Sequence, residues 1–457
     1  MENTQDIRKR TQPWGRLQLR LRGKTTRRIA LAMIALAVFG LLGFSLLAWR
    51  PAITPIEPPS RESFPAESIA KGETLAAAGH CGACHTRRGG QPFAGGYALN
   101  TQFGTIYSTN ITPDPTTGIG RWSLEAFARA MHEGVSRDGS HLFPAFPYDH
   151  YTKLSDDDVK ALYAYFMTQP PVRAMAPANT IPFPLNIRAL QEGWKIMFFR
   201  SGRYRTDPSK SAEWNRGAYL AEGISDCGGC HTPRNLLGAE KANDAYAGTV
   251  IEDWIAPALT EANPSPVPWT QDELFSYLRT GVGSLHGATA GPMTPVIRGG
   301  LSVVPDADNR ALAVYFADID RAGARKPAVE FAVSRALATS PLGSGQEYEP
   351  DARLYAAACI ACHYNTGSAP LPARPELALN SALTLPEPTN FIQVVLKGIG
   401  NTQGVPGLVM PAYASALTDA DIARLAAYLR RTRTDRPPWT DLEKKVAAIR
   451  NDPATVQ

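Results

Sequence analysis

The 457-residue sequence predicts a mainly α-helical chain, in which three similar small domains follow one N-terminal transmembrane helix. A helix pattern with leucine, tyrosine and a further apolar residue at positions i, i+3 and i+4 occurs three times. A shorter helix pattern, bounded by Ser or Thr and by Gly, precedes each copy. An uninterrupted apolar run lies near the N-terminus. Glycine and proline, 38 of each, predict long loops around small cores.

The apolar run covers residues 29–49 and contains no charged side chain over 21 residues, about the length that crosses the hydrocarbon core of a membrane. A cleaved signal peptide has a shorter apolar region and a small-residue cleavage site, whereas this run ends in Ala-Trp-Arg at 48–50. Residues 1–28 hold nine Lys or Arg and two acidic residues, so they are expected to stay in the cytoplasm. The rest of the chain is slightly acidic. The net charge of +5 therefore indicates a membrane anchor with its following domains outside, and no nucleic-acid binding.

All six cysteines fall into three copies of the pattern Cys-x-x-Cys-His, at 81–85, 227–231 and 359–363. Two thiols at this spacing can form thioethers with the two vinyl groups of one haem, and the adjoining histidine then reaches the iron. Zinc ribbons, thioredoxin-like redox pairs and structural disulfides do not account for a histidine after every pair. The sequence thus predicts three covalently bound haem c groups, attached outside the cytoplasm. The predicted thioether residues are Cys81, Cys84, Cys227, Cys230, Cys359 and Cys362, and the predicted iron ligands are His85, His231 and His363.

Helices of the kind that surrounds haem c are expected around each motif. Closing helices are predicted at 156–166, 306–316 and 419–429, with acidic residues at their starts that suit the helix dipole. The element before each closing helix is bounded by predicted N-caps and C-caps. The N-caps are Ser123, Thr270 and Thr389, and the C-caps are Gly134, Gly281 and Gly398. Trp122 and Trp269, next to two of these caps, are expected to pack in the core or at the haem edge.

A methionine thioether on the far side of the haem would hold the iron in an electron-transfer state. Met293 in Gly-Pro-Met-Thr-Pro and Met410 in Met-Pro are the predicted sixth ligands of the second and third haems. At the corresponding place in the first domain stands Phe146, which cannot coordinate iron. The candidates there are His150 and His141 in the same loop and Met131 and His132 on the preceding helix; His150 is favoured because it keeps the ligand in the loop.

The predicted organisation is three tandem class I cytochrome c domains behind the anchor. Residues 168–213 are proline-rich and 321–350 have linker composition. The apolar segment 194–199 is expected to pack in a domain core, between domains or against a partner. The C-terminal extension is charged and is expected to wrap the surface. The predicted boundaries are a cytoplasmic tail at 1–28, the anchor at 29–49, cytochrome c domains at 62–170, 209–322 and 348–434, linkers at 171–208 and 323–347, and the extension at 435–457.

From about residue 64 to 431 the chain resembles the three-haem cytochrome c subunits of membrane-bound periplasmic dehydrogenases. The resemblance includes Asn-Ile-Thr-Pro-Asp at 110–114, Thr-Gly-Ile-Gly at 117–120, Trp-Asn-Arg-Gly-Ala-Tyr-Leu at 214–220 and His-Thr-Pro-Arg-Asn at 231–235. That family serves alcohol, gluconate, sorbitol and aldehyde dehydrogenases and molybdenum hydroxylases of nicotinate-like rings. In the alcohol dehydrogenase branch a methionine ligand stands where this chain has Phe146; the version here, with Asp-His-Tyr at 149–151, looks more like the molybdenum hydroxylase and aldehyde dehydrogenase branch.

The resemblance implies that electrons arrive from a catalytic dehydrogenase subunit, often through an iron–sulfur subunit, and leave to ubiquinone or an oxidase. No nicotinamide, flavin or molybdenum site is expected in this chain, since its Gly-x-Gly triplets lack the strand-turn-helix context of a dinucleotide fold. The leading hypothesis is an electron-transfer subunit in the bacterial inner membrane. The alternatives are a haem peroxidase, supported only by the missing methionine of the first domain, and a haem-based redox or gas sensor, for which residues 1–28 are too short to signal.

Overall fold

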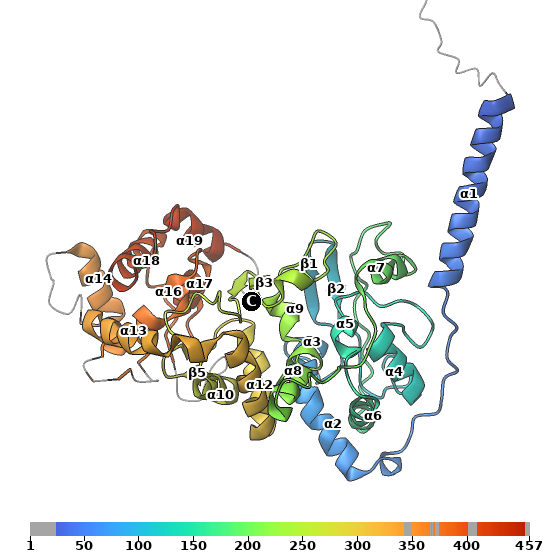
Figure 1. Cartoon of the computed structure of the whole chain (residues 1–457), viewed down its shortest axis with the longest axis horizontal. Coiled ribbons are helices and arrows are strands. Elements are labelled where there is room, and N and C mark those ends of the chain that lie inside the picture. Colours follow the sequence, from blue (N-terminus) through green and yellow to red (C-terminus); the bar gives the residue numbers. More distant parts are fainter. Residues whose placement is uncertain are drawn as a thin grey trace, which may run out of the picture. The chain divides into compact units, whose positions relative to one another are not determined.

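The computed structural model describes residues 24–341, 349–365, 367, 369–370, 374–400 and 409–452 (Figure 1). The chain divides into two compact units, residues 1–49 and residues 50–457. In the first unit, helix α1 runs from Lys24 to Ala48, five residues longer at its start than the predicted run. Of the described helices, α1 is the one that is long and apolar enough to cross a membrane, by length and composition.

Residues 62–170 fold around two helices, α2 (Ala66–Ala78) and α6 (Asp156–Met167), which pack on each other. A Cβ atom at Gly72 of α2 would lie 2.0 Å from the carbonyl oxygen of Ala161 of α6, so the helices cross where only a glycine fits. Strands β1 and β2 form an antiparallel hairpin with Ala98 opposite Tyr107. The remaining elements of this part are η1 (Arg61–Ser63), α3 (Cys81–His85), β1 (Ala98–Thr101), β2 (Gly104–Tyr107), α4 (Leu124–Glu133) and α5 (Tyr148–Tyr151).

Residues 209–322 repeat this arrangement, with α8 (Ala212–Glu222) packed on α12 (Asp306–Ile319). A Cβ atom at Gly217 would lie 2.0 Å from the carbonyl oxygen of Ala311, as in the first helix pair. The β3–β4 and β5–β6 hairpins are antiparallel, and all sheets among the described residues have two strands. The other elements are α9 (Cys227–His231), η2 (Ala242–Asp244), β3 (Thr249–Ile251), β4 (Trp254–Ala256), α10 (Gln271–Thr280), β5 (Val282–Gly283), β6 (Gly287–Ala288), α11 (Met293–Arg298) and η3 (Leu301–Val303).

The third part pairs α14 (Pro350–Ala358) with α18 (Asp419–Arg433). The C-terminal α19 (Leu442–Arg450) packs on α17 and α18, and it buries Val446 while the preceding loop buries Trp439. The C-terminal extension therefore contributes Trp439 and Val446 to the apolar core of the third part. The other elements are η4 (Ala322–Arg325), α13 (Lys326–Thr339), α15 (Ile360–His363), η5 (Leu377–Leu379), α16 (Ser381–Thr384) and α17 (Thr389–Lys397).

Capping residues set the ends of the predicted helices. The hydroxyls of Ser123 and Thr270 accept hydrogen bonds from backbone N–H groups of α4 and α10, as expected of N-caps. Gly134 and Gly281 end these helices with φ of 61° and 81°. The prediction of Thr389 as an N-cap is wrong by one residue, because α17 already includes Thr389 and the N-cap is Pro388. All three closing helices start at the predicted aspartates, and each runs one to four residues further than predicted.

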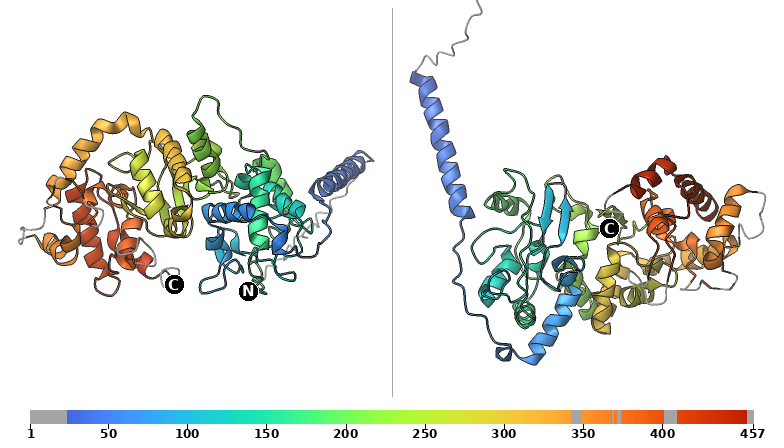
Figure 2. Two further views of the ribbon diagram at one scale, coloured as in Figure 1. Left: turned by 90° about the horizontal axis from the view of Figure 1, so that it is seen from below. Right: turned by 180° about the vertical axis from the view of Figure 1, so that it is seen from behind.

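The linkers are more structured than their composition indicates. One apolar core runs from α2 and α6 through α8 and α12, so the first and second parts share a core, while the third has its own. Residues 321–350, expected to be loop, contain α13, which buries Ala336 against Leu379. The first linker contains α7 (Leu190–Phe198). The two further views in Figure 2 show α13 as a continuous helix between the second and third parts.

Candidate haem-binding sites

Each Cys-x-x-Cys-His motif forms one helical turn directly after a longer helix. The turns are α3, α9 and the segment from Cys359 through α15. Residues three apart on a helix lie on the same face, so the two thiols of each motif point to one side. All six cysteines lie in the described part of the chain, and none is in a disulfide. In the first two motifs the residue before the first cysteine, His80 or Asp226, has a left-handed backbone that turns the chain into the motif.

The three motif histidines are held in one common orientation. The Nδ1–H groups donate to backbone carbonyl oxygens: His85 to Thr109 at 2.7 Å, His231 to Pro257 at 2.7 Å and His363 to Pro375 at 3.1 Å. Because a carbonyl can only accept, each ring carries its proton on Nδ1 and leaves the Nε2 lone pair available. Burial lowers the pKa of all three rings, which keeps them neutral. This is the arrangement in which a histidine ligates a metal through Nε2.

One continuous apolar cavity joins the second and third motifs. Its wall contains the thiols and histidines of both motifs together with Met293 and Met410. Met293 begins α11, and Met410 is fixed by a bridge in which its backbone exchanges hydrogen bonds with Ile399. Leu312 and Phe316 of α12 and Leu425 and Leu429 of α18, predicted from the repeated helix pattern, line the same cavity. A thiol pair, a neutral imidazole and a thioether are the donor groups that haem c requires, and an apolar wall suits its porphyrin. The residues present therefore fit haem c.

Trp269 lies in the wall of this cavity, as predicted from its position next to a cap. Its ring stacks on His286, with centroids 3.6 Å apart and planes inclined by 15°. Glu273 of α10 holds His286, since its carboxylate accepts from the ring at 3.0 Å and from the backbone N–H of Leu285. The sequence carried no signal for the role of His286, because a single histidine in a loop has no distinguishing spacing.

On the far side of the first motif, Phe146 packs edge-on against Tyr151 with ring centroids 5.3 Å apart. Both rings lie on the core that contains Cys81 and Phe166. Three residues before the C-cap glycine, α4 carries Met131, where α10 carries Leu278. Leu278 lines the cavity beside the second motif, and Met131 is a buried thioether at the equivalent position of α4.

His150 is buried between the first and second parts of the chain. Its Nδ1–H donates to the carbonyl oxygen of Glu222 at 2.9 Å, and Nε2 lies 3.0 Å from carboxylate oxygens of both Asp226 and Glu240. Since every neighbour is an acceptor, the ring is protonated. Burial alone lowers the pKa of His150, but the two carboxylates outweigh it and raise the pKa to about 10. His150 thus stands beside the second motif, and ligation of the first iron, which remains a prediction, requires Nε2 to leave both carboxylates.

The other two candidate histidines are also engaged. His141 accepts a hydrogen bond at Nδ1 from the buried ammonium of Lys195 at 3.0 Å. His132 accepts one at Nδ1 from Arg203 at 2.7 Å, and burial together with that guanidinium lowers the pKa of His132 to about 4. Among the four candidates, Met131 is therefore the one whose donor atom belongs to an apolar core.

Comparison with known proteins agrees with this site. Residues 69–170 match the family model "Cytochrome c", and residues 346–429 match "Cytochrome C oxidase, cbb3-type, subunit III". The chain is 39% identical to the fructose dehydrogenase cytochrome subunit of Gluconobacter japonicus over 81% of this chain and 80% of that one. It is 37% identical to the gluconate 2-dehydrogenase cytochrome c subunit of Pantoea cypripedii over 85% of this chain and 90% of that one.

The chain is also 45% identical to a nicotinate dehydrogenase subunit of Pseudomonas putida over 93% of its own length, and it spans 35% of the length of that relative. The similarity to these relatives extends over most of the chain, as do the helices and the motifs. Cytochrome c domains imply covalently bound haem c. The chain belongs to the family of cytochrome c subunits of periplasmic dehydrogenases.

Proposed function

We propose that this chain binds three haem c groups and acts as the membrane-anchored electron-transfer subunit of a periplasmic dehydrogenase in the bacterial inner membrane. The observation that carries the proposal is the repeated orientation of His85, His231 and His363, each with Nδ1–H on a backbone carbonyl. Three neutral imidazoles, each with its Nε2 lone pair available and each beside a thiol pair, have no simpler common explanation than three iron ligands. When bound, the haems supply one-electron redox chemistry.

The residues of the chain have distinct tasks in this proposal. The six motif cysteines would hold the haems through thioether bonds, and the motif histidines would supply iron ligands. Met293 and Met410 would supply thioether ligands at the second and third sites, which would raise the potential relative to bis-histidine ligation. The apolar walls from α10, α12, α17 and α18 exclude water, which keeps the surroundings nearly unchanged between oxidation states. The shared cavity supports direct transfer between the second and third sites.

The proposed donor is a separate catalytic dehydrogenase subunit, with an iron–sulfur subunit between the two, and the proposed acceptor is ubiquinone or a terminal oxidase. The 45% identity to the nicotinate dehydrogenase relative supports a molybdenum hydroxylase of nitrogen heterocycles as the donor. In the loop that contains Phe146, Asp149 and His150 resemble the version found in the molybdenum hydroxylase and aldehyde dehydrogenase branch of the family.

The test is purification of the full chain from membranes with its companion subunits. The expected result is a haem-staining band on a denaturing gel, three haems per chain by pyridine haemochrome assay, and rapid haem reduction when a nitrogen heterocycle is added to the complex. A protein with fewer haems, or haems that the complex does not reduce with any substrate that it oxidises, contradicts the proposal. Peroxide turnover by the isolated chain at enzymatic rates would support the peroxidase alternative.

A further inference from the structure

We propose that helix α7 and the loop before it lie on the surface of an anionic lipid bilayer and form a second membrane contact of the chain. The contact surface, here called the α7 surface, consists of Phe183, Leu185, Ile187, Leu190, Ile196 and Met197. The inference rests on the proposed membrane anchoring, and it adds a contact that orients the haem-bearing unit on the membrane.

The side chains of the α7 surface are open to solvent although they are large and apolar. Phe183 is 79% exposed, Ile196 55% and Met197 52%, and the other three members are each at least 40% exposed. Six such residues lie within a stretch of 15, with Asn186, Arg188 and buried Trp194 between them, whereas single exposed apolar residues are common on protein surfaces. Such a segment indicates a surface that is covered in the working molecule.

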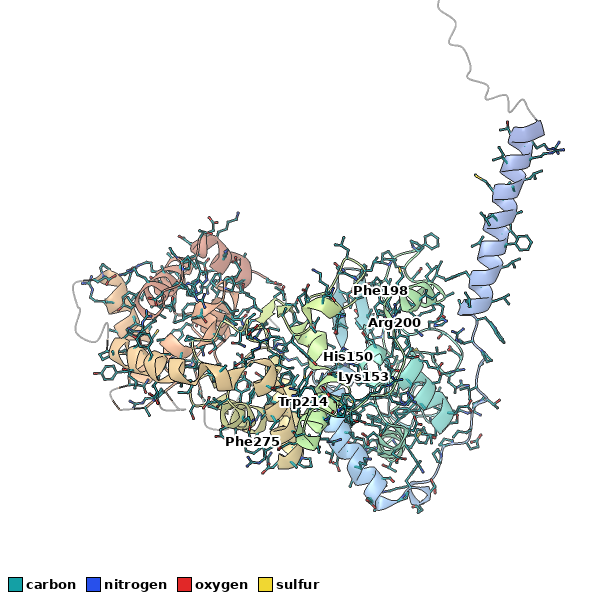
Figure 3. The ribbon with its side chains drawn as sticks, in the orientation of Figure 1. His150, Lys153, Phe198, Arg200, Trp214 and Phe275 are labelled. Atoms are coloured by element: carbon teal, nitrogen blue, oxygen red, sulfur yellow. The ribbon has the colours of Figure 1, made fainter. Side chains whose placement is uncertain are left out.

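The opposite face of α7 is firmly packed, so the exposure does not come from a loosely attached helix. Trp194 is buried, stacks edge-on against Tyr148 and donates from Nε1 to the carbonyl oxygen of Leu237 at 2.9 Å. Lys195, next to it, donates to the carbonyl oxygen of Gly134 at 2.8 Å. Figure 3 shows Phe198 and Arg200 at the end of this helix. A helix with one face anchored and one apolar face open has the form of an interfacial amphipathic helix.

The charges around the α7 surface are almost all positive. Residues 172–206 contain six basic residues and a single acidic one, Glu192. Glu192 is neutralised by Arg50, whose guanidinium lies 3.0 Å from its carboxylate. Exposed Arg200 and Arg205 follow the apolar stretch, as does Arg203, whose guanidinium pairs with Asp156 at 2.6 Å. Apolar side chains bordered by arginines match a bilayer with anionic headgroups, since the arginines are attracted to the phosphates while the apolar groups enter the acyl boundary.

Chain connectivity brings this surface to the membrane. Arg50 is the first residue of the haem-bearing unit, and it follows the last residue of the apolar run that is proposed to cross the bilayer. Its ion pair with Glu192 therefore ties α7 to the residue at which the chain leaves the membrane. A catalytic partner is the other possible occupant, but covalent proximity to the bilayer and the arginine border favour lipid.

A spin label tests the proposal on the full-length, haem-loaded chain. With all six native cysteines in thioether bonds, Met197→Cys supplies a single reactive thiol on the α7 surface. Val303→Cys is the matched control, because Val303 is an apolar residue of η3 that is 64% exposed. Both proteins are reconstituted into vesicles of phosphatidylglycerol and phosphatidylcholine, and sedimentation with the vesicles reports anchoring separately.

In vesicles, the label at residue 197 is expected to lose most of its relaxation by a water-soluble paramagnetic ion and to gain relaxation by oxygen, while the label at residue 303 keeps its response to the ion. A chain that sediments with vesicles but leaves the label at residue 197 open to the ion overturns the inference and leaves the anchoring intact. Protection that arises only on addition of the catalytic subunit also overturns it, since the surface then belongs to a protein. A chain that fails to sediment overturns both.

Discussion

Gly72 on α2 and Ala161 on α6 are in such close contact that a Cβ atom on the glycine would lie 2.0 Å from the alanine carbonyl oxygen. Gly217 and Ala311 repeat this relationship in the second domain at the same distance. In both cases the crossing helix, α2 or α8, is the one that precedes the Cys-x-x-Cys-His turn. The spacing between the motif and the closing helix is thus set by a backbone contact, which cannot adapt as a flexible side chain can.

Gly72→Ala is expected to destabilise the protein by about 3 kcal/mol, because the added methyl group must force α2 and α6 apart. The measurement is the free energy of unfolding from chemical denaturation, followed by haem absorbance and far-UV circular dichroism. Gly323→Ala is the control, since a Cβ atom there meets nothing within 4 Å. Equal stabilities of the two variants would contradict the close contact.

Met293→Leu and Met410→Leu are each expected to remove the near-infrared charge-transfer signal of one methionine-ligated ferric haem and to lower the potential of that haem. The physical reason is the loss of the thioether, a ligand that favours the ferrous state. Covalent haem content should stay unchanged because the cysteines are intact. Exposed Met197→Leu serves as the control. A variant with unchanged potentials would exclude that methionine as a ligand.

Local patterns were enough to predict the helices that carry the sites. The starts of α6, α12 and α18 follow from aspartates before an i, i+3, i+4 stripe, and the C-cap glycines follow from the need for a left-handed residue. Non-local features were not predictable. The shared core of the first two parts depends on which helices meet. Helix α13 was missed because its own helix-forming residues were considered together with the Gly, Pro and Ser residues that follow it at 340–345.

The candidate site shows the same division. Spacing alone brought thiols and histidines together in each motif, and the methionine loops were recognisable from their prolines. The surroundings of His150 were not recognisable from the sequence, because Asp226 and Glu240 lie far from His150 along the chain and contact it only after folding. The sequence alone does not distinguish a histidine that ligates iron from a histidine that pairs with carboxylates.

His150→Ala tests the proposed sixth ligand of the haem that is proposed at the first motif. If His150 ligates this iron, as predicted from the loop, the near-infrared signal of one ferric haem changes and the other two stay as they are. Met131→Leu is the companion variant, because it places in α4 the leucine that α10 has at the equivalent position. A spectrum that changes with Met131→Leu and not with His150→Ala would assign the ligand to Met131 and His150 to the ion cluster.

The ion cluster of His150, Asp226 and Glu240 predicts a pH-dependent contribution to stability. The pKa of His150 is raised to about 10 in the folded chain, from about 6.5 in an unfolded one. Between these values the folded protein binds the proton and the unfolded protein does not, so this contribution is complete below pH ~6.5 and is lost as the pH rises toward ~10. Removing the imidazole leaves buried Asp226 without its nearest cation, while the guanidinium of Arg234 stays 3.5 Å from Glu240, so the expected cost is about 3 kcal/mol.

The free energies of unfolding of wild type and His150→Ala are therefore expected to differ most near pH 6 and to converge as the pH approaches 10. Glu240→Gln tests whether the carboxylates cause the raised pKa of His150. It removes one carboxylate that accepts from the ring, so the pH at which the two free energies of unfolding converge should be lower. Denaturant titration of wild type and variants at several pH values gives the free energies of unfolding and the pH at which they become equal. A difference that stays constant from pH 6 to pH 10 would mean that His150 is neutral in the folded chain, and the hydrogen bonds of Nε2 to the two carboxylates would then have to be abandoned.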